Sequence, residues 1–199
     1  MKPILLTLAV LAGTAFAQGW MLEGKARFYT GDEAEVYAKL LGEDEAEIQV
    51  GTVDAQGNFR LTLPETLAVA PIAPNSDCGM TATPGLKLGI LERLEVRRGD
   101  EILGELSFAS HPVSSGAVGL GERKDHGRYG FLFHANGNGS IQQRCVNARE
   151  AQFADVEFQP GWNWITARVT MQNDKPALFL SSGVKPGLMR WWFVATQPE

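Results

Sequence analysis

Apolar and polar residues alternate along most of the chain after position 18, which is the pattern of half-buried strands. Every second residue from Phe59 to Leu63 is apolar, and the same holds from Ile165 to Met171. No later segment long enough for a helix carries an apolar stripe at helical spacing. The pattern therefore predicts an all-β protein, specifically an antiparallel Greek-key β-sandwich of about eleven strands.

Turn residues separate these segments. Residues 54–58 (Asp-Ala-Gln-Gly-Asn) predict a hairpin, because Gly and Asn tolerate a positive φ and Asp can accept hydrogen bonds from its own backbone. Residues 136–139 and 160–161 predict two more tight turns. Two longer segments, 68–87 and 109–128, are interrupted by Pro and Gly or rich in Gly, Ser and charge, and they predict loops that serve as contact surfaces.

The first seventeen residues have the features of a secretory signal peptide. Lys2 precedes an apolar run, and residues 15–17 (Ala-Phe-Ala) form a small-x-small cleavage site. Residues 18–199 are then expected to form a single β-sandwich domain, with a sub-boundary in the loop 68–87 as the alternative. The expected location is the cell envelope, either periplasm or cell surface, or the medium. No segment approaches the roughly 20 apolar residues of a transmembrane span.

Charge and cysteine content refine this expectation. The chain has 18 Lys and Arg against 23 Asp and Glu, a net charge of −5, which argues against a nucleic-acid partner. Cys78 and Cys145 are the only two cysteines, and thiols of exported proteins tend to pair. We therefore expect one disulfide between Cys78 and Cys145, with two separate buried thiols as the alternative.

Two fragments resemble known families. Residues 51–64 (GTVDAQGNFRLTLP) resemble the strand-turn-strand signature of carboxypeptidase-regulatory-like and transthyretin-like sandwich modules. Residues 130–134 (GFLFH) followed by 161–165 (GWNWI) resemble uncharacterised secreted cell-envelope proteins of radiation-resistant bacteria. The resemblance implies an exported β-sandwich of the envelope. Its motifs are structural and transfer no active site.

The three histidines, His111, His126 and His134, form the candidate metal site, because imidazole nitrogen binds copper or zinc. Residues 130–134 also resemble the G-F-H-x-H strand of copper-zinc superoxide dismutases, with Leu132 where that family has its first strand ligand. This resemblance implies a copper-dependent oxidoreductase as the enzyme alternative. The opposing interpretation is that these are loop histidines or a hydrogen-bonded strand histidine.

No nucleophile motif and no cofactor loop occur in the sequence, so no catalytic residue and no required cofactor are expected. The leading hypothesis is a non-catalytic interaction or structural module that binds an envelope or surface-layer protein, or a polysaccharide. A carbohydrate-binding module is the second alternative, because Trp162 and Trp164 share one face of a predicted strand and could stack on sugars. Core packing is the competing role for both rings.

Overall fold

The computed structural model describes residues 19–72, 79–113, 127–146, 151–172, 175–183 and 187–196. These residues form strands, and none of them is helical; the described part of the chain accordingly holds no apolar helix able to cross a membrane. The strands, in chain order, are β1 (Trp20–Arg27), β2 (Ala34–Leu41), β3 (Glu45–Val53), β4 (Asn58–Leu63), β5 (Ala70–Pro71), β6 (Thr81–Ala82), β7 (Lys87–Arg98), β8 (Glu101–Ala109), β9 (Gly127–Ala135), β10 (Gly139–Val146), β11 (Ala151–Phe158), β12 (Gly161–Gln172), β13 (Lys175–Ser182) and β14 (Arg190–Ala195).

The alternation read from the sequence appears directly in the strands. In β4 the side chains of Phe59, Leu61 and Leu63 are buried while those between them are exposed, because successive side chains point to opposite faces of a sheet. In β12 the buried positions are Ile165, Ala167 and Val169, also as predicted.

The β3–β4 hairpin turn forms as the sequence predicts. The Asp54 carboxylate accepts hydrogen bonds from the backbone N–H groups of Gln56, at 2.9 Å, and Asn58, at 2.8 Å. Gly57 has a φ of 80°, which a residue with a Cβ rarely adopts. A hydrogen bond from the Asn58 side-chain amide to this carboxylate, at 2.9 Å, and the two backbone hydrogen bonds lower the pKa of Asp54.

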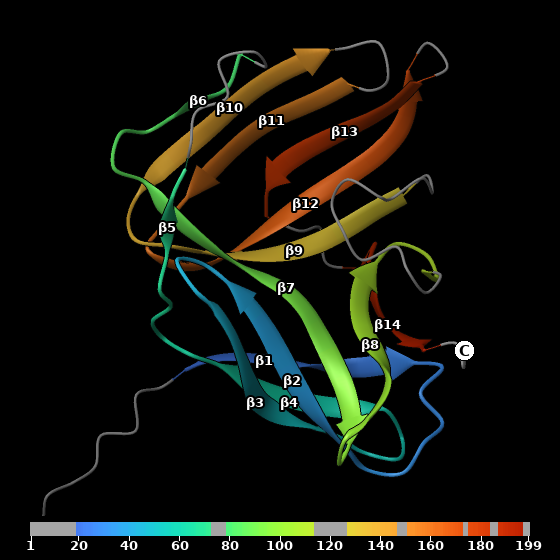
Figure 1. The fold of residues 1–199 in the computed structure, drawn as a ribbon. Helices are drawn as coiled ribbons and strands as arrows, with labels where there is room; N and C mark the ends of the chain where they lie inside the picture. The colour runs from blue at the N-terminus through green and yellow to red at the C-terminus, as the bar shows by residue number, and fades with distance from the viewer. Residues whose placement is uncertain are drawn as a thin grey trace, which may run out of the picture.

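All strands belong to one hydrogen-bonded sheet with the order β5-β7-β2-β3-β4-β1-β14-β8-β9-β12-β13-β11-β10-β6. Additional pairings of β7 with β8 and with β9 close the run from β7 to β9 into an eight-stranded barrel, which fills the lower half of Figure 1. Strands β12, β13, β11, β10 and β6 continue from β9 as an open sheet above the barrel, and β5 pairs with β7. We call β9, β12, β13, β11, β10 and β6 the upper sheet.

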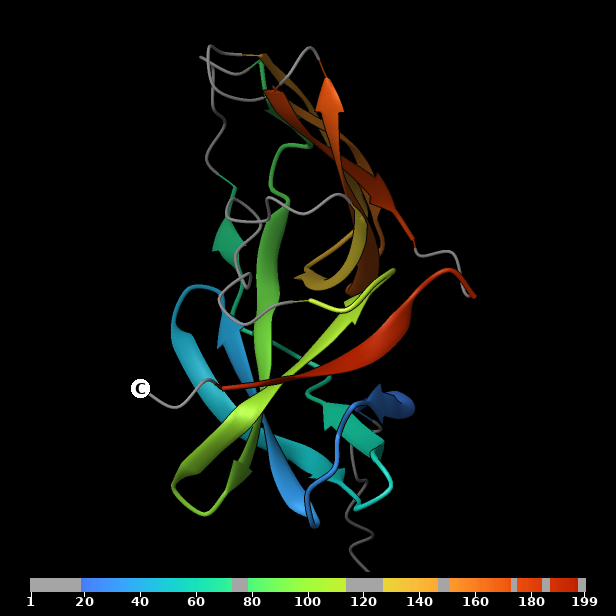
Figure 2. The ribbon, with the colours of Figure 1, turned by 90° about the vertical axis from the view of Figure 1, so that its right-hand side faces the viewer.

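Two strands make the closure. The first part of β7 pairs with β9, for example Leu91 with Leu132, and its second part pairs with β8, for example Leu94 with Leu106. β14 lies between β8 and β1 and pairs with β1 in parallel, with Ala26 opposite Trp191. Figure 2 shows β14 as the red strand that crosses the middle of the molecule.

The predicted Greek-key β-sandwich is therefore wrong, although the all-β class is right. Sandwiches and barrels both bury every second side chain of a strand, so alternation does not distinguish them. The distinction lies in pairings between segments far apart in the chain, such as β1 with β14. The structure has fourteen strands rather than about eleven, and two of the added ones, β5 and β6, lie in the segment 68–87 that was predicted as a loop.

Of the two cysteines in the predicted disulfide, the structure describes only Cys145, and no described cysteine is free. Cys145 is buried on β10, and Cys78 lies outside the described part of the chain. β6, which follows Cys78 in the sequence, pairs with β10 through Thr81 and Gln142. The pairing of the two cysteines stays a prediction.

Separate clusters of buried side chains form the core. One fills the barrel, with Val36, Leu61 and Val96 fully buried. Two smaller clusters cover one face of the upper sheet, where Ile165 and Ala167 lie. We call this the core face, and the opposite face of the upper sheet the open face.

Candidate anion-binding site

The side chain of His134, one of the two candidate metal ligands that the structure describes, makes packing and hydrogen-bond contacts. Its side chain is 7% exposed, and its Nε2 donates a hydrogen bond to the backbone carbonyl of Glu65 at 2.9 Å. Its ring meets the Trp162 ring edge to face, with 5.2 Å between centroids. Trp162 in turn donates its indole N–H to the carbonyl of Pro64 at 2.8 Å. Both side chains hold the segment that follows β4 against the upper sheet.

His111 lies elsewhere. Its Nε2 is 3.4 Å from the Tyr129 hydroxyl, and its Nδ1 is 3.2 Å from the Ser110 hydroxyl. Tyr129 and His134 lie on opposite faces of β9, separated by about 16 Å at the strand rise of 3.2–3.4 Å per residue. The structure thus does not bring His111 and His134 together, and His126 lies outside the described residues. Within the described ranges no group of three or more His, Cys, Asp or Glu side chains could hold a metal ion.

The tryptophans considered for sugar stacking are engaged in packing. Trp164 contacts Trp20, Phe108 and Trp191, with ring centroids between 5.0 and 6.2 Å apart. The Trp164 ring therefore joins the upper sheet to the barrel.

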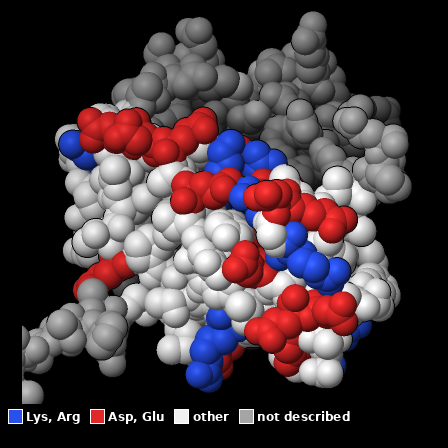
Figure 3. Space-filling view, turned by 60° about the horizontal axis from the view of Figure 1, so that its bottom comes forward, with Lys and Arg blue, Asp and Glu red and all other residues white. Residues whose placement is uncertain are grey.

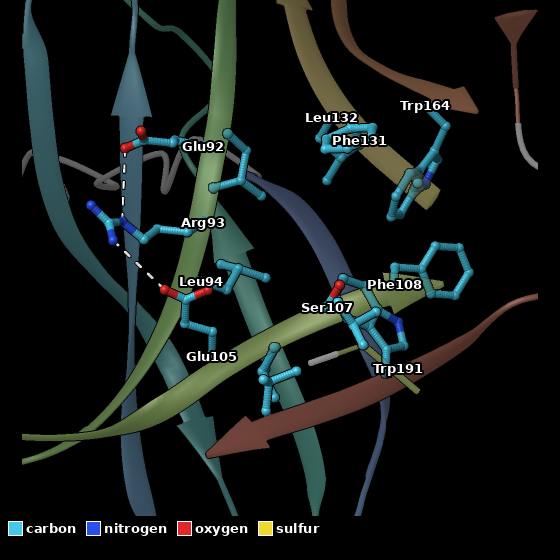
Figure 4. Close-up of a pocket in the computed structure, with 15 residues that line it drawn as sticks. Glu92, Arg93, Leu94, Glu105, Ser107, Phe108, Phe131, Leu132, Trp164 and Trp191 are labelled. Atoms are coloured by element: carbon cyan, nitrogen blue, oxygen red, sulfur yellow. Dashed lines mark ion pairs between the residues drawn. The ribbon is translucent and has the colours of Figure 1, made fainter. Parts of the chain in front are cut away.

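A cavity of about 60 Å³ lies at this junction, where β7 leaves β9 for β8 (Figure 4). Phe108, Trp164 and Trp191 line one side of it, while the Arg93 guanidinium points away toward Glu92 and Glu105. Ligand pockets usually measure about 300–1,000 Å³, so this cavity is too small for most ligands.

The loops predicted as contact surfaces are described only in part. Residues 73–78 and 114–126 lie outside the described ranges. The rest of the segment 68–87 contributes β5 and β6 to the sheet edges.

The open face of the upper sheet carries a row of arginine and phenylalanine side chains. Residues directly opposite each other in neighbouring strands point to the same face. The strand register places Arg144 opposite Phe153, Phe153 opposite Phe179, Phe179 opposite Arg168, and Arg168 opposite Arg128. We call these five residues, from β10, β11, β13, β12 and β9, the arginine row.

The side chains in the middle of the arginine row stack on one another. The rings of Phe153 and Phe179 are nearly parallel, at 14°, with centroids 4.8 Å apart. The Arg168 guanidinium lies 4.9 Å from the centroid of the Phe179 ring. One face of Phe179 therefore meets Phe153 and the other meets a cation, an arrangement that attracts the guanidinium and holds it in place.

None of the three guanidinium groups of the arginine row has a carboxylate partner among the described residues. Arg168 and Arg128 are opposite each other on adjacent strands, and like charges in that position repel. Arg97 in the barrel is different: its guanidinium binds both oxygens of Glu47 and also Glu95, which raises its pKa.

An open pocket of about 570 Å³ covers this part of the face. All five side chains of the arginine row line it, and Leu188 and Met189 come from the connection between β13 and β14. Beside the arginine row runs a polar row, in which Asp155 is opposite Gln142 and Ser181, and Ser181 is opposite Thr166. The pocket thus combines three guanidinium groups that have no carboxylate partner among the described residues with the hydroxyl groups of Thr166 and Ser181 and the carboxylate of Asp155.

The path of β12 explains how a solvated site comes to lie beside a core. Trp164, Thr166 and Arg168 occupy one face of this strand in succession. Trp164 packs against the barrel, Thr166 lines the pocket, and Arg168 is exposed. The same face of β12 therefore lies in the barrel core at Trp164 and in the open pocket at Thr166 and Arg168.

Sequence reasoning missed this site because its members come from five strands, each contributing one residue. Of the row, only Arg168 lies within the alternating segment from Ile165 to Met171 that the sequence predicts as a strand. The available signal was Phe153, an aromatic residue three positions before the core residue Val156 and so on the opposite strand face.

Comparison of the chain with protein-family models, with curated proteins and with solved structures gives no match.

Proposed function

We propose that the protein is a non-catalytic binding module of the cell envelope, and that the open face of its upper sheet binds an anionic group of its partner. The observation that carries this proposal is the pair Arg128–Arg168, which lines the pocket and whose guanidinium groups have no carboxylate partner among the described residues. The leading hypothesis from the sequence, an interaction module, is kept. Its contact surface moves from the loops to a strand face.

The physical reason is electrostatic. Two guanidinium groups opposite each other repel, and this repulsion destabilises the protein without ligand. A carboxylate, phosphate or sulfate between them replaces repulsion with charge-assisted hydrogen bonds, which are about twice as strong as neutral ones. Arginine suits this task because its planar group presents several donors and stays charged at any physiological pH.

Sulfate tests the proposal because it is a simple divalent anion. Thermal unfolding of the wild type is compared with that of Arg128→Gln and Arg60→Gln, in sulfate and in chloride at equal ionic strength. Arg60 is an exposed barrel arginine that pairs with Glu23 at 2.5 Å and serves as the matched control. Ligand that binds only the folded state raises its stability with the logarithm of ligand concentration.

Sulfate also stabilises proteins in general through exclusion from their surfaces, so the difference between variants is the informative quantity. We expect the sulfate-induced rise in Tm to be larger for the wild type and Arg60→Gln than for Arg128→Gln. An equal rise in all three proteins would contradict an anion site at the arginine row.

A further inference from the structure

We infer that the natural ligand of the arginine row is an acidic polysaccharide whose sugars carry carboxylates, a polyuronate. This inference rests on the proposed function and names its ligand class. It follows from three features of the open face: the orientation of the aromatic rings, the polar row and the extent of the arginine row.

The Phe179 ring is not a platform for stacking. Phe179 has Phe153 on one face, at 4.8 Å, and the Arg168 guanidinium on the other, at 4.9 Å. Proteins that bind single-stranded nucleic acid stack the bases on free aromatic faces. An aromatic ring has a negative face and a positive edge, so rings whose faces are covered favour an anion at their edges. The arrangement suits an anionic ligand without flat bases.

The polar row distinguishes a sugar polymer from a densely charged polyanion. Asp155 is exposed, and it has no ion pair with any described residue. A carboxylate repels a phosphate chain but accepts hydrogen bonds from sugar hydroxyls. Ser181 on β13, the neighbouring strand, and Thr166 on β12, the strand beyond it, add hydroxyl groups to the same row. A ligand with carboxylates along one edge and hydroxyls along the other matches the two rows.

The arginine row is too long for a ligand with a single charged group to contact all of its arginines. Arg144 on β10 and Arg168 on β12 are separated by three strand spacings, about 14 Å at 4.7–4.9 Å each. Arg128 lies one strand further on. A single sulfate or carboxylate can occupy only the Arg128–Arg168 pair, whereas a chain lying across the strands also reaches Arg144.

Calorimetric titration of the full chain with three polymers tests the inference: polygalacturonate, inorganic polyphosphate and neutral dextran. The proteins are the wild type, Arg168→Gln, Asp155→Ala and the control Arg60→Gln. We expect polygalacturonate to bind and dextran not to bind. Arg168→Gln should weaken the affinity for polygalacturonate about tenfold, because a charge-assisted hydrogen bond is lost. Arg60→Gln is expected to match the wild type.

Asp155→Ala gives the sharper result, because this substitution is expected to change the affinities for the two kinds of polyanion in opposite directions. Loss of a hydroxyl acceptor weakens polygalacturonate binding, whereas loss of a negative charge strengthens polyphosphate binding. Stronger binding of both polymers to Asp155→Ala would overturn the polyuronate inference. So would arginine-dependent binding of polyphosphate without binding of polygalacturonate, and in that case the proposed anion site would stand. No arginine-dependent binding of either polymer, together with an equal sulfate effect in all variants, would overturn both.

Discussion

The outside of the barrel and the open face of the upper sheet both carry arginines, but their surroundings differ. On the barrel, Arg97 binds Glu47 through two hydrogen bonds of 2.6 and 2.7 Å, and Arg93 lies 3.2 Å from Glu95. Figure 3 shows basic and acidic side chains side by side over this end of the molecule. On the open face, Arg168 meets a phenylalanine ring and another arginine instead.

This difference separates charge that serves the fold from charge that is available to a ligand. In a barrel whose outer face is solvated, paired charges keep strands soluble and satisfy one another. Three arginines that have no carboxylate partner among the described residues, in a protein of net charge −5, are not explained by solubility. The comparison predicts that removal of a charge lowers stability on the barrel and changes ligand binding on the open face.

Glu95→Gln is expected to have the largest effect on stability. Glu95 is 6% exposed and lies between Arg93 and Arg97, so its loss leaves two guanidinium groups without their most buried partner. We expect the free energy of unfolding to fall by about 1–3 kcal/mol in urea titrations at low salt. Glu23→Gln, which removes an exposed pair with Arg60, should cost about 0–1 kcal/mol. Equal losses in the two variants would remove the distinction between buried and exposed pairs on the barrel.

Phe179→Leu is expected to have a smaller effect, confined to anion binding. The Phe179 ring holds the Arg168 guanidinium by a cation–π contact, which contributes about 0.5–1 kcal/mol at exposed sites. The sulfate-induced gain in unfolding free energy should fall by no more than this amount. Phe153→Leu leaves the ring beneath Arg168 in place and is the matched control. A larger loss for Phe153→Leu than for Phe179→Leu would show that the stack does not position Arg168.

Lowering the pH should reduce the stability that the barrel carboxylates contribute and leave the charge of the arginine row unchanged. Hydrogen bonds from Arg97 lower the pKa of Glu47 below its ordinary value of 4.5. A carboxyl with a lowered folded-state pKa stabilises the protein above its unfolded-state pKa, and this contribution is lost as pH falls through the folded-state pKa. Wild type should therefore lose more stability than Glu47→Gln below about pH 4.5. Because Glu47 is exposed, solvent screens its ion pair, and the difference in stability loss between the two proteins should be small.

The same acid titration in sulfate provides the contrast. Arginine stays charged throughout this range, so the sulfate-induced stabilisation should persist where the contribution of Glu47 is lost. Loss of the sulfate effect in parallel with the Glu47 contribution would mean that a carboxylate takes part in the anion site.

Local features of the fold could be predicted from the sequence because they depend on neighbouring residues. The turn at residues 54–58 and the alternation of Phe59, Leu61 and Leu63 both formed as expected. Closure of the barrel could not be predicted, because it depends on Ala26 meeting Trp191, at the opposite end of the chain. Nothing in either segment distinguishes this partner from any other half-buried strand.

The candidate site could not be predicted for a related reason. β11 pairs with β13 in parallel, and β12 lies on the other side of β13, so chain order does not give the order of strands across the row. The histidines drew attention in the sequence because they are rare. In the structure His134 holds a backbone carbonyl and His111 lies on another face of β9.

A double-mutant cycle of Arg128 and Arg168 measures the central claim most directly. The unfolding free energies of wild type, Arg128→Gln, Arg168→Gln and the double variant isolate the interaction between the two side chains. In low-salt chloride we predict an unfavourable coupling of about 0.2–1 kcal/mol, as for like charges on adjacent strands. In sulfate at equal ionic strength the coupling should become favourable, because one anion then binds both guanidinium groups. A coupling that is zero, or the same in both salts, would contradict an anion site between these two arginines.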